Sequence, residues 1–256
     1  MNLWQLLLYQ PLVNALFALY HWLGNLGWAI IVLTLIIRFL LLPLTWPALK
    51  ASQKMRDLAP KLKKLRKKYA KNKEKLAAAQ MELYRQAGIK PWASLVPQVV
   101  QVIILIALYQ VFRHVLGGNG NLEKLNQLLY PALPFSIQSP INLRFWYLDL
   151  SQPDLFRWQG RLVFPGLFLT LSALSQFLSA RLMLPAAQQQ KQLAQKTPAT
   201  SDDLIAAMQT QSLYLFPLMT ILVGLSFPSG LVLYWLAFSL FNLGQQIIIK
   251  SKFGRK

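Results

Sequence analysis

One charged residue lies inside an apolar segment that is long enough to cross a membrane. Arg38 lies 11 residues after Gly27 in the segment 27–46, and about 20 apolar residues rising roughly 1.5 Å each span the core of a bilayer. Arg38 is therefore expected roughly 16 Å into the segment, near the middle of the membrane. A guanidinium keeps its charge at cellular pH, and inserting it at that depth costs about 2.5–3.5 kcal/mol. A charge this costly needs a reason, so Arg38 is a candidate functional residue.

The residues that catalysis or metal binding would need are missing from the apolar segments. The predicted spans given below contain no Asp or Glu, the chain has no Cys, and its two histidines, His21 and His114, lie at or beyond span ends. Proton relays and cation-coupled transporters usually need ionisable groups within the bundle. The sequence therefore predicts a protein that is not an enzyme and that holds no cofactor and no metal ion.

The composition is typical of an all-α polytopic membrane protein, because 55% of the 256 residues are hydrophobic. Five segments qualify as transmembrane helices: 27–46, 92–112, 162–184, 213–227 and 231–249. Before them, apolar residues recur at helical spacing through residues 1–24, but polar residues interrupt the run. We expect this segment to be an amphipathic helix on the external membrane interface, and a sixth span is the alternative.

The distribution of charge predicts the topology. The chain carries a net charge of +19, and residues 50–90 contain 14 Lys/Arg against three acidic residues. A basic tail follows at 250–256. The positive-inside rule places both regions in the cytoplasm, and the four spans between them give the required parity. The N-terminus and the loop 113–161 are then external, the loop 185–211 is cytoplasmic, and the protein is a multi-pass protein of the plasma (inner) membrane.

The cytoplasmic segment 47–91 is predicted to be a basic helical hairpin. Its apolar residues alternate in steps of four and three, as in a helix seam: Leu58, Leu62, Leu65, Tyr69, Leu76, Ala79 and Leu83. A break at residues 71–73 would make the two helices antiparallel. Two interpretations stay open, an anchor on anionic lipid headgroups and a docking surface for ribosomal RNA. No feature indicates DNA as a partner.

Polar residues recur on one face of several predicted spans. Unsatisfied polar groups are costly in lipid, so these faces are expected to converge around Arg38 and to line a wet, positively charged cavity. The candidate lining residues are Thr34, Gln98, Gln101, Gln176, Trp235 and Asn242. Small and hydroxyl residues also hold transmembrane helices together without any further role, and for the serines of span 162–184 that interpretation is favoured.

Several motifs in this order resemble the core of YidC-type membrane protein insertases, the YidC/Oxa/Albino family. They are Gly27–Arg38 with the following Leu-Leu-Leu-Pro-Leu44, Ser52–Met55, Leu58-Ala-Pro60, Lys68-Tyr69, Leu83-Tyr84, Leu95-Val-Pro97, Ala107-Leu-Tyr109, Phe227–Trp235, Asn242 and Gln245-Gln246. The resemblance covers about residues 10–250. It is to the short form of the family, since no large external domain precedes residue 27.

The resemblance implies a function and assigns roles. Arg38 matches the groove arginine that attracts acidic residues in the external segment of a substrate, and the second and fourth spans would form a slide for an incoming helix. The slide residues would be Val96, Val99, Ile103, Phe216 and Met219. Nascent membrane proteins are the implied partners, with the ribosome and the Sec translocon as further candidates. A channel or transporter for a small anion, with Arg38 as its selectivity charge, is the alternative function.

Overall fold

The computed structural model describes residues 3–70, 72–89, 96–116, 127–131, 141–158, 162–182 and 214–253. Within these ranges the chain is mostly helical, with two short β-hairpins. It divides into two compact units. The first comprises Met1–Leu40, Val100–Ser175 and Leu218–Phe241, and the second comprises Leu41–Val99, Gln176–Pro217 and Asn242–Lys256.

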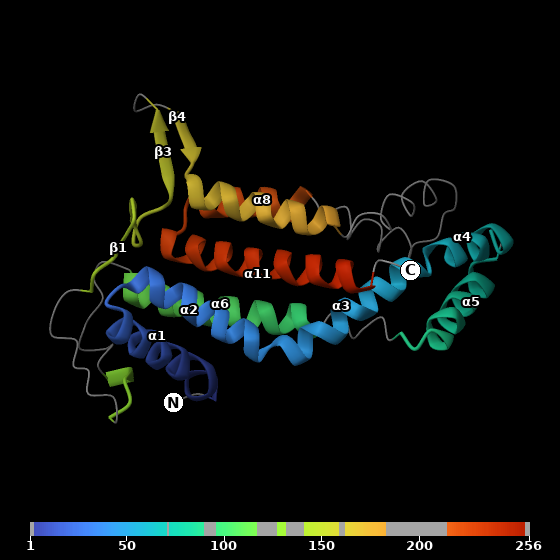
Figure 1. Cartoon of the computed structure of the whole chain (residues 1–256), viewed down its shortest axis with the longest axis horizontal. Coiled ribbons are helices and arrows are strands. Elements are labelled where there is room, and N and C mark those ends of the chain that lie inside the picture. Colours follow the sequence, from blue (N-terminus) through green and yellow to red (C-terminus); the bar gives the residue numbers. More distant parts are fainter. Residues whose placement is uncertain are drawn as a thin grey trace. The chain divides into compact units, whose positions relative to one another are not determined.

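The first unit begins with a helical pair (Figure 1). Its elements are a π-helical turn η1 (Gln5–Tyr9), α1 (Gln10–Leu23) and α2 (Leu26–Leu40). Gly24 ends α1 in the left-handed conformation at φ 67°, which glycine adopts without a steric penalty. The chain then reverses, and α1 packs along α2 through buried apolar residues: Val13, Leu16, Phe17, Leu26, Ala29, Ile30 and Leu33.

Polar side chains attach the N-terminal helix to the rest of the first unit. The buried Asn14 amide donates to the Leu128 carbonyl at 2.9 Å, and its oxygen accepts from the Tyr130 N–H at 2.6 Å. Trp4 Nε1 donates to Gln110 Oε1 at 2.9 Å. Asn14, one of the polar residues that interrupt the apolar run, therefore makes contacts within the protein. The position of residues 1–24 on the membrane interface stays a prediction, with a sixth span as its alternative.

The expected single helix 27–46 is interrupted near its end. Helix α2 stops at Leu40, and α3 (Leu42–Asp57) starts after a turn at Leu41. Pro43 explains the break, because proline has no N–H and its ring clashes with the carbonyl four residues earlier. Thr45, which an unbroken helix would place on the face of Arg38, belongs to α3 in the second unit instead.

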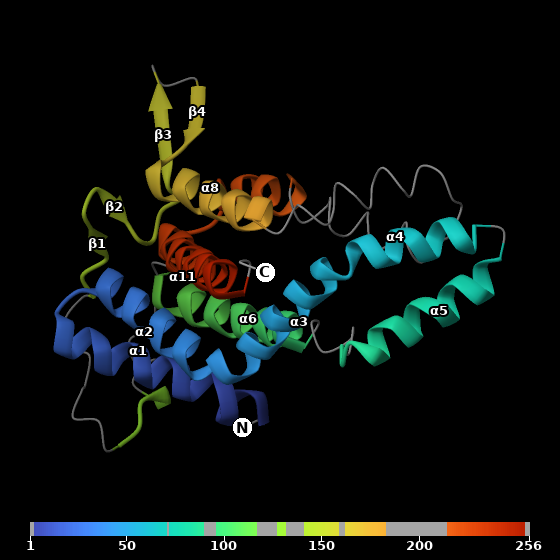
Figure 2. The same cartoon turned by 45° about the vertical axis from the view of Figure 1, so that its right-hand side comes forward.

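The second unit contains the basic hairpin, which Figure 2 shows as two antiparallel helices. They are α4 (Ala59–Lys68) and α5 (Lys73–Gln86). The Asn72 side chain caps α5 by accepting from the Lys75 N–H at 3.0 Å. Leu62 and Leu76 are buried in the contact between the helices, so one apolar seam holds the hairpin while its exterior is basic.

The remaining apolar helices are α6 (Val96–Leu116), α8 (Leu167–Leu182), Tyr214–Gly224 and α11 (Ser229–Phe253). Among the described residues, Gln5–Leu23 and Ser229–Ser251 are each long and apolar enough to cross a membrane alone. A third span results if α2 and Leu42–Ala51 are one broken helix. The all-α polytopic membrane architecture is confirmed, and the number of five spans stays a prediction. Residues 92–95 lie outside the described part.

Two β-hairpins precede α8. The first pairs β1 (Arg144–Phe145) with β2 (Leu148–Asp149), and the second pairs β3 (Leu155–Trp158) with β4 (Leu162–Pro165). Strands β1 to β3 lie in the expected loop 113–161, whereas β4 occupies the start of the predicted span 162–184, so the helix begins only at Leu167. The buried Asp154 carboxylate accepts from the Leu169 N–H at 2.8 Å and from the Tyr147 hydroxyl at 2.9 Å. Burial, and then its bond to Asp154, raises the pKa of Tyr147 to about 12, so the phenol remains a donor at neutral pH.

The start of α2 depends on a close approach to β1. A Cβ atom placed on Gly27 would overlap the Phe145 ring, whereas one on Gly244 of α11 would meet nothing within 4 Å. We expect Gly27→Ala to lower the free energy of unfolding by about 1–3 kcal/mol through overpacking, and Gly244→Ala to leave it within about 1 kcal/mol. Denaturant unfolding in detergent micelles measures both. Equal effects of the two substitutions would contradict this packing.

Candidate functional site

Arg38 is buried in the first unit, with 5% of its surface exposed. Its guanidinium donates to the Gln101 side-chain oxygen from α6. It also lies over the Phe238 ring of α11, with its central carbon 3.7 Å from the ring centroid. A cation over an aromatic face is stabilised by the ring quadrupole, by about 2 kcal/mol when desolvated. Three helices of the same unit therefore contribute to the environment of this charge.

Gln101 links Arg38 to a second buried residue. Its amide nitrogen donates to the Tyr234 hydroxyl at 2.7 Å, and Tyr234 also interacts electrostatically with Arg38. Tyr234 is only 1% exposed, so its hydroxyl needs a partner inside the protein. Arg38, Gln101, Tyr234 and Phe238 are called the arginine cluster below.

The arginine cluster solvates the cation without neutralising it. An amide oxygen, a phenol hydroxyl and an aromatic face are all uncharged groups. Across the described part of the chain no carboxylate forms an ion pair with Arg38, whereas Arg85 and Glu82 pair on the basic hairpin. Arg38 therefore retains a positive charge that an anionic group could satisfy.

The other predicted lining residues have different positions. Thr34 lies one turn before Arg38 and is buried, but its hydroxyl donates to the Ile30 carbonyl at 2.6 Å. Trp235 is half-buried and its ring contacts Phe227 at 6.2 Å between centroids. Gln176 and Asn242 belong to the second unit, where their role stays a prediction. The Gln98 side chain lies outside the described residues.

The predicted slide residues are apolar side chains on the surface. Val99 and Ile103 of α6 are 58% and 36% exposed, and Phe216 and Met219 are 63% and 45% exposed. The Val96 side chain is outside the described part. Exposed apolar side chains on membrane helices suit contact with lipid or with another apolar helix.

Two residues of the arginine cluster were not predicted from the sequence. In the predicted span 231–249 the polar face that includes Trp235 and Asn242 was expected to line the site, whereas Tyr234 and Phe238 start one position earlier on the helix. Their spacing of four places both on one helical face. A tyrosine within an apolar span needs a hydrogen-bond partner, and that requirement is the signal that points to Tyr234.

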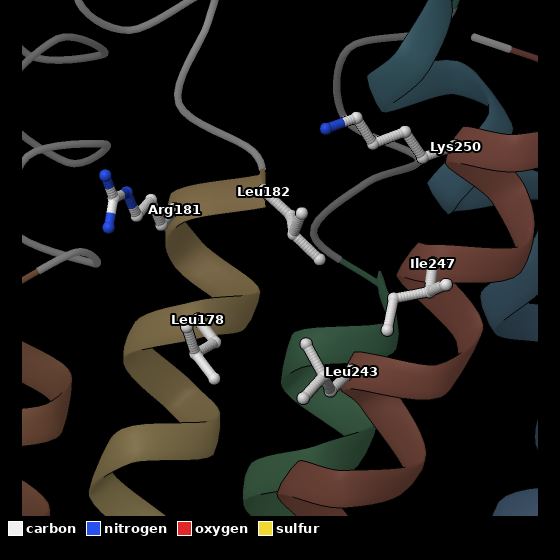
Figure 3. A pocket seen from close by; sticks show the side chains of 6 residues that line it. All are labelled: Leu178, Arg181, Leu182, Leu243, Ile247 and Lys250. Carbon is white, nitrogen blue, oxygen red and sulfur yellow. The ribbon is translucent and has the colours of Figure 1, made fainter.

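A separate cleft of about 410 Å³ occurs in the second unit, near the C-terminal ends of α8 and α11 (Figure 3). Its lining residues are Leu178, Arg181, Leu182, Leu243, Ile247 and Lys250. The two cations are exposed, and the other four side chains are apolar. This cleft offers no buried polar group, so the arginine cluster is the better candidate for binding a polar segment.

Comparisons with known proteins identify the family. The family model described as 60Kd inner membrane protein matches residues 18–256. The membrane protein insertase YidC of Fusobacterium nucleatum is 32% identical over 231 residues, which cover 90% of this chain and 89% of that protein. The chain belongs to the YidC family. The resemblance seen in the sequence motifs is thereby confirmed.

Other YidC proteins are longer than this chain. The YidC of Campylobacter jejuni is 30% identical over 99% of this chain and 39% of its own length. The YidC of Wolinella succinogenes is 32% identical over 94% of this chain and 37% of its own length. The chain thus spans less than half the length of these relatives. A crystal structure of an active YidC insertase with its first transmembrane domain resolved shares the fold, with a TM-score of 0.55, 23% identity, and coverage of 95% of this chain and 46% of that one.

The hydrogen bond between Gln101 and Tyr234 in the arginine cluster of this YidC-family chain should contribute to stability. Tyr234→Phe removes the acceptor of the Gln101 amide, and a buried donor left unpaired costs about 1–3 kcal/mol. We expect a loss of that size in the free energy of unfolding, measured by denaturant titration in micelles. Tyr214→Phe is the control, because Tyr214 is 62% exposed, and its loss should stay within about 0.5 kcal/mol. Similar losses in both variants would contradict the buried hydrogen bond.

Proposed function

We propose that this chain is a membrane protein insertase. It moves short polar segments of nascent membrane proteins across the bilayer and releases their hydrophobic helices into lipid. The observation that carries the proposal is Arg38, a buried cation whose described partners are all neutral. The names of the YidC relatives support the same function. In this proposal Arg38, Thr34 and Gln101 belong to a hydrated groove that is open to the cytoplasm.

The energetic argument concerns the carboxylates of the substrate. Carrying an acidic residue to the middle of a bilayer costs about 2.5–3.5 kcal/mol. A carboxylate 4 Å from a cation gains about 4 kcal/mol at an effective dielectric constant of 20, and about 1 kcal/mol in water. Pairing with Arg38 therefore offsets most of the cost for one acidic residue. The neutral partners keep Arg38 available for that pairing.

Release into lipid needs no chemical energy. Leu, Ile, Phe and Val each contribute about −0.3 to −0.6 kcal/mol at the centre of a membrane. A substrate segment with about ten such residues gains roughly 3–6 kcal/mol on partitioning. The exposed apolar residues of α6 and of Tyr214–Gly224 provide the surface along which it leaves, which is the proposed slide. On the cytoplasmic side, the basic hairpin rests on anionic headgroups.

The proposal predicts a charge effect at position 38. We expect Arg38→Ala to slow insertion of single-span substrates with acidic external tails by at least about fivefold, because the variant loses the pairing with the tail carboxylate. A barrier higher by about 1.4 kcal/mol corresponds to a tenfold lower rate. Arg38→Lys keeps the charge and should retain most of the activity. Protease protection of the substrate tail in reconstituted vesicles measures insertion. A substrate whose tail acids are replaced by amides is the control, and the variants should insert it alike.

Equal insertion of the acidic substrate by the wild type and Arg38→Ala would overturn the electrostatic role. A channel for small anions would instead use Arg38 as a selectivity charge. Sustained chloride flux through the purified protein in vesicles, together with absent insertion, would favour that alternative.

The proposed slide predicts where a substrate touches the protein. A photo-crosslinking amino acid at Ile103 or Met219, which are 36% and 45% exposed, should form adducts with a stalled nascent membrane protein. The matched control is Ile104 of the same helix, which is 7% exposed and should give few or none. Adducts of equal yield from Ile103 and Ile104 would contradict the slide.

A further inference from the structure

Exposed aromatic side chains gather at the end of the first unit where α8 begins. Trp146 and Tyr147, in the turn between β1 and β2, are 78% and 56% exposed. Phe156 of β3 and Phe164 of β4 are 56% and 48% exposed. Single exposed apolar residues are normal, but a group of large aromatic residues on neighbouring hairpins marks an interaction surface.

The two faces of the β3–β4 hairpin differ in charge and in aromatic content. Phe156 pairs with Phe164, and Arg157 pairs with Val163. Residues directly opposite in an antiparallel pair share a face, and successive residues alternate between faces. One face therefore carries the aromatic pair and the other carries Arg157, which is the one charged residue of the two strands. An isolated two-stranded hairpin is marginally stable in water, so this one needs further support.

The base of the hairpin is fixed to the first turn of α8. Asp154, just before β3, binds the Leu169 N–H, and its own carbonyl accepts from the Gly166 N–H at 2.8 Å. A Cβ on Gly166 would overlap the Asp154 carboxylate. Figures 1 and 2 both show the hairpin projecting sideways from the start of α8, across the helix axis. With the axis of the apolar helix α8 along the membrane normal, such a projection runs along the membrane surface.

Trp146 is held in an unusual backbone conformation at the same end. Its φ of 52° lies in the left-handed region, which is a genuine outlier for a bulky residue. Strained residues of this kind persist where the surrounding structure fixes them, often at functional sites. The indole lies 6.1 Å from the Phe168 ring of α8, between centroids. Indole and phenol rings favour the headgroup level of a bilayer.

We propose that the β3–β4 hairpin and Trp146 form an interfacial anchor in the leaflet at the N-terminal end of α8. Phe156 and Phe164 face the acyl chains, and the Trp146 indole sits among the headgroups. Arg157, on the opposite face, meets the phosphate groups of anionic lipids. Asp154, just before β3, is buried and accepts from the Leu169 N–H of α8. It therefore does not compete with the lipid phosphates for Arg157. The partner is the bilayer itself.

Spin labels can test this anchor, because the chain has no cysteine of its own. Single cysteines at Phe164 and Val163 carry the label on opposite faces of the hairpin, in phosphatidylcholine vesicles with and without phosphatidylglycerol. Collisions with oxygen report lipid, and collisions with a water-soluble nickel complex report water. We expect the oxygen-to-nickel ratio at Phe164 to exceed that at Val163 several-fold. A label at Leu174, which is 49% exposed on α8, gives the value for an embedded site.

Two results would overturn the proposal. Equal nickel accessibility at Phe164 and Val163 would mean that the aromatic face is solvated. Poor accessibility of Phe164 to both reagents would mean that protein covers it, such as a second copy of the chain.

A label at Trp146→Cys leaves the hairpin sequence intact and should also report a depth near the headgroups. Arg157→Gln should abolish any change in depth that phosphatidylglycerol causes, and persistence of that change would remove Arg157 from the anchor.

Discussion

The central constraint on this molecule is the burial of a permanent cation, Arg38, that pairs with no acid in the described part of the chain. Arg38 is solvated by the Gln101 amide and the Tyr234 hydroxyl and is covered by the Phe238 ring. Arg38 belongs to α2, Gln101 to α6, and Tyr234 and Phe238 to α11. These three helices must therefore be held together for the charge to be tolerated. Neutral dipoles lower the cost of burial, yet they leave the net charge in place. Structural stability and function therefore depend on the same contacts.

The sequence predicted the central pair of this site but only part of its surroundings. Arg38 and Gln101 were both expected, because a charge and an amide inside apolar spans are costly unless they meet. Tyr234 and Phe238 were missed. Helix α11 has apolar residues around most of its circumference, so periodicity does not define a single inward face. The break at Leu41 was also missed, although Pro43 is its direct cause.

The N-terminal helix and the segment 113–161 were the hardest parts to predict. Asn14 and Gln10 seemed to interrupt an amphipathic helix, whereas both donate to the Leu128 carbonyl. These partners lie more than 110 residues away, and local spacing carries no information about them. The strands around Trp146 are only two to four residues long, too short for a pattern of alternation to stand out. The basic hairpin was predictable because its seam is local and repeats in steps of three and four.

The bond between the Asp154 carboxylate and the first turn of α8 bears on how the protein's own acids are kept away from Arg38. If Arg38 pairs with acidic substrate segments, as proposed, the protein must keep its own acids from occupying it. Asp154 is buried against the first turn of α8, and Asp149 accepts from the Ser151 hydroxyl at 2.6 Å. Each of these carboxylates is thus committed to its own neighbourhood. Local bonds of this kind at Asp149 and Asp154 limit competition between these acids and an acidic substrate segment.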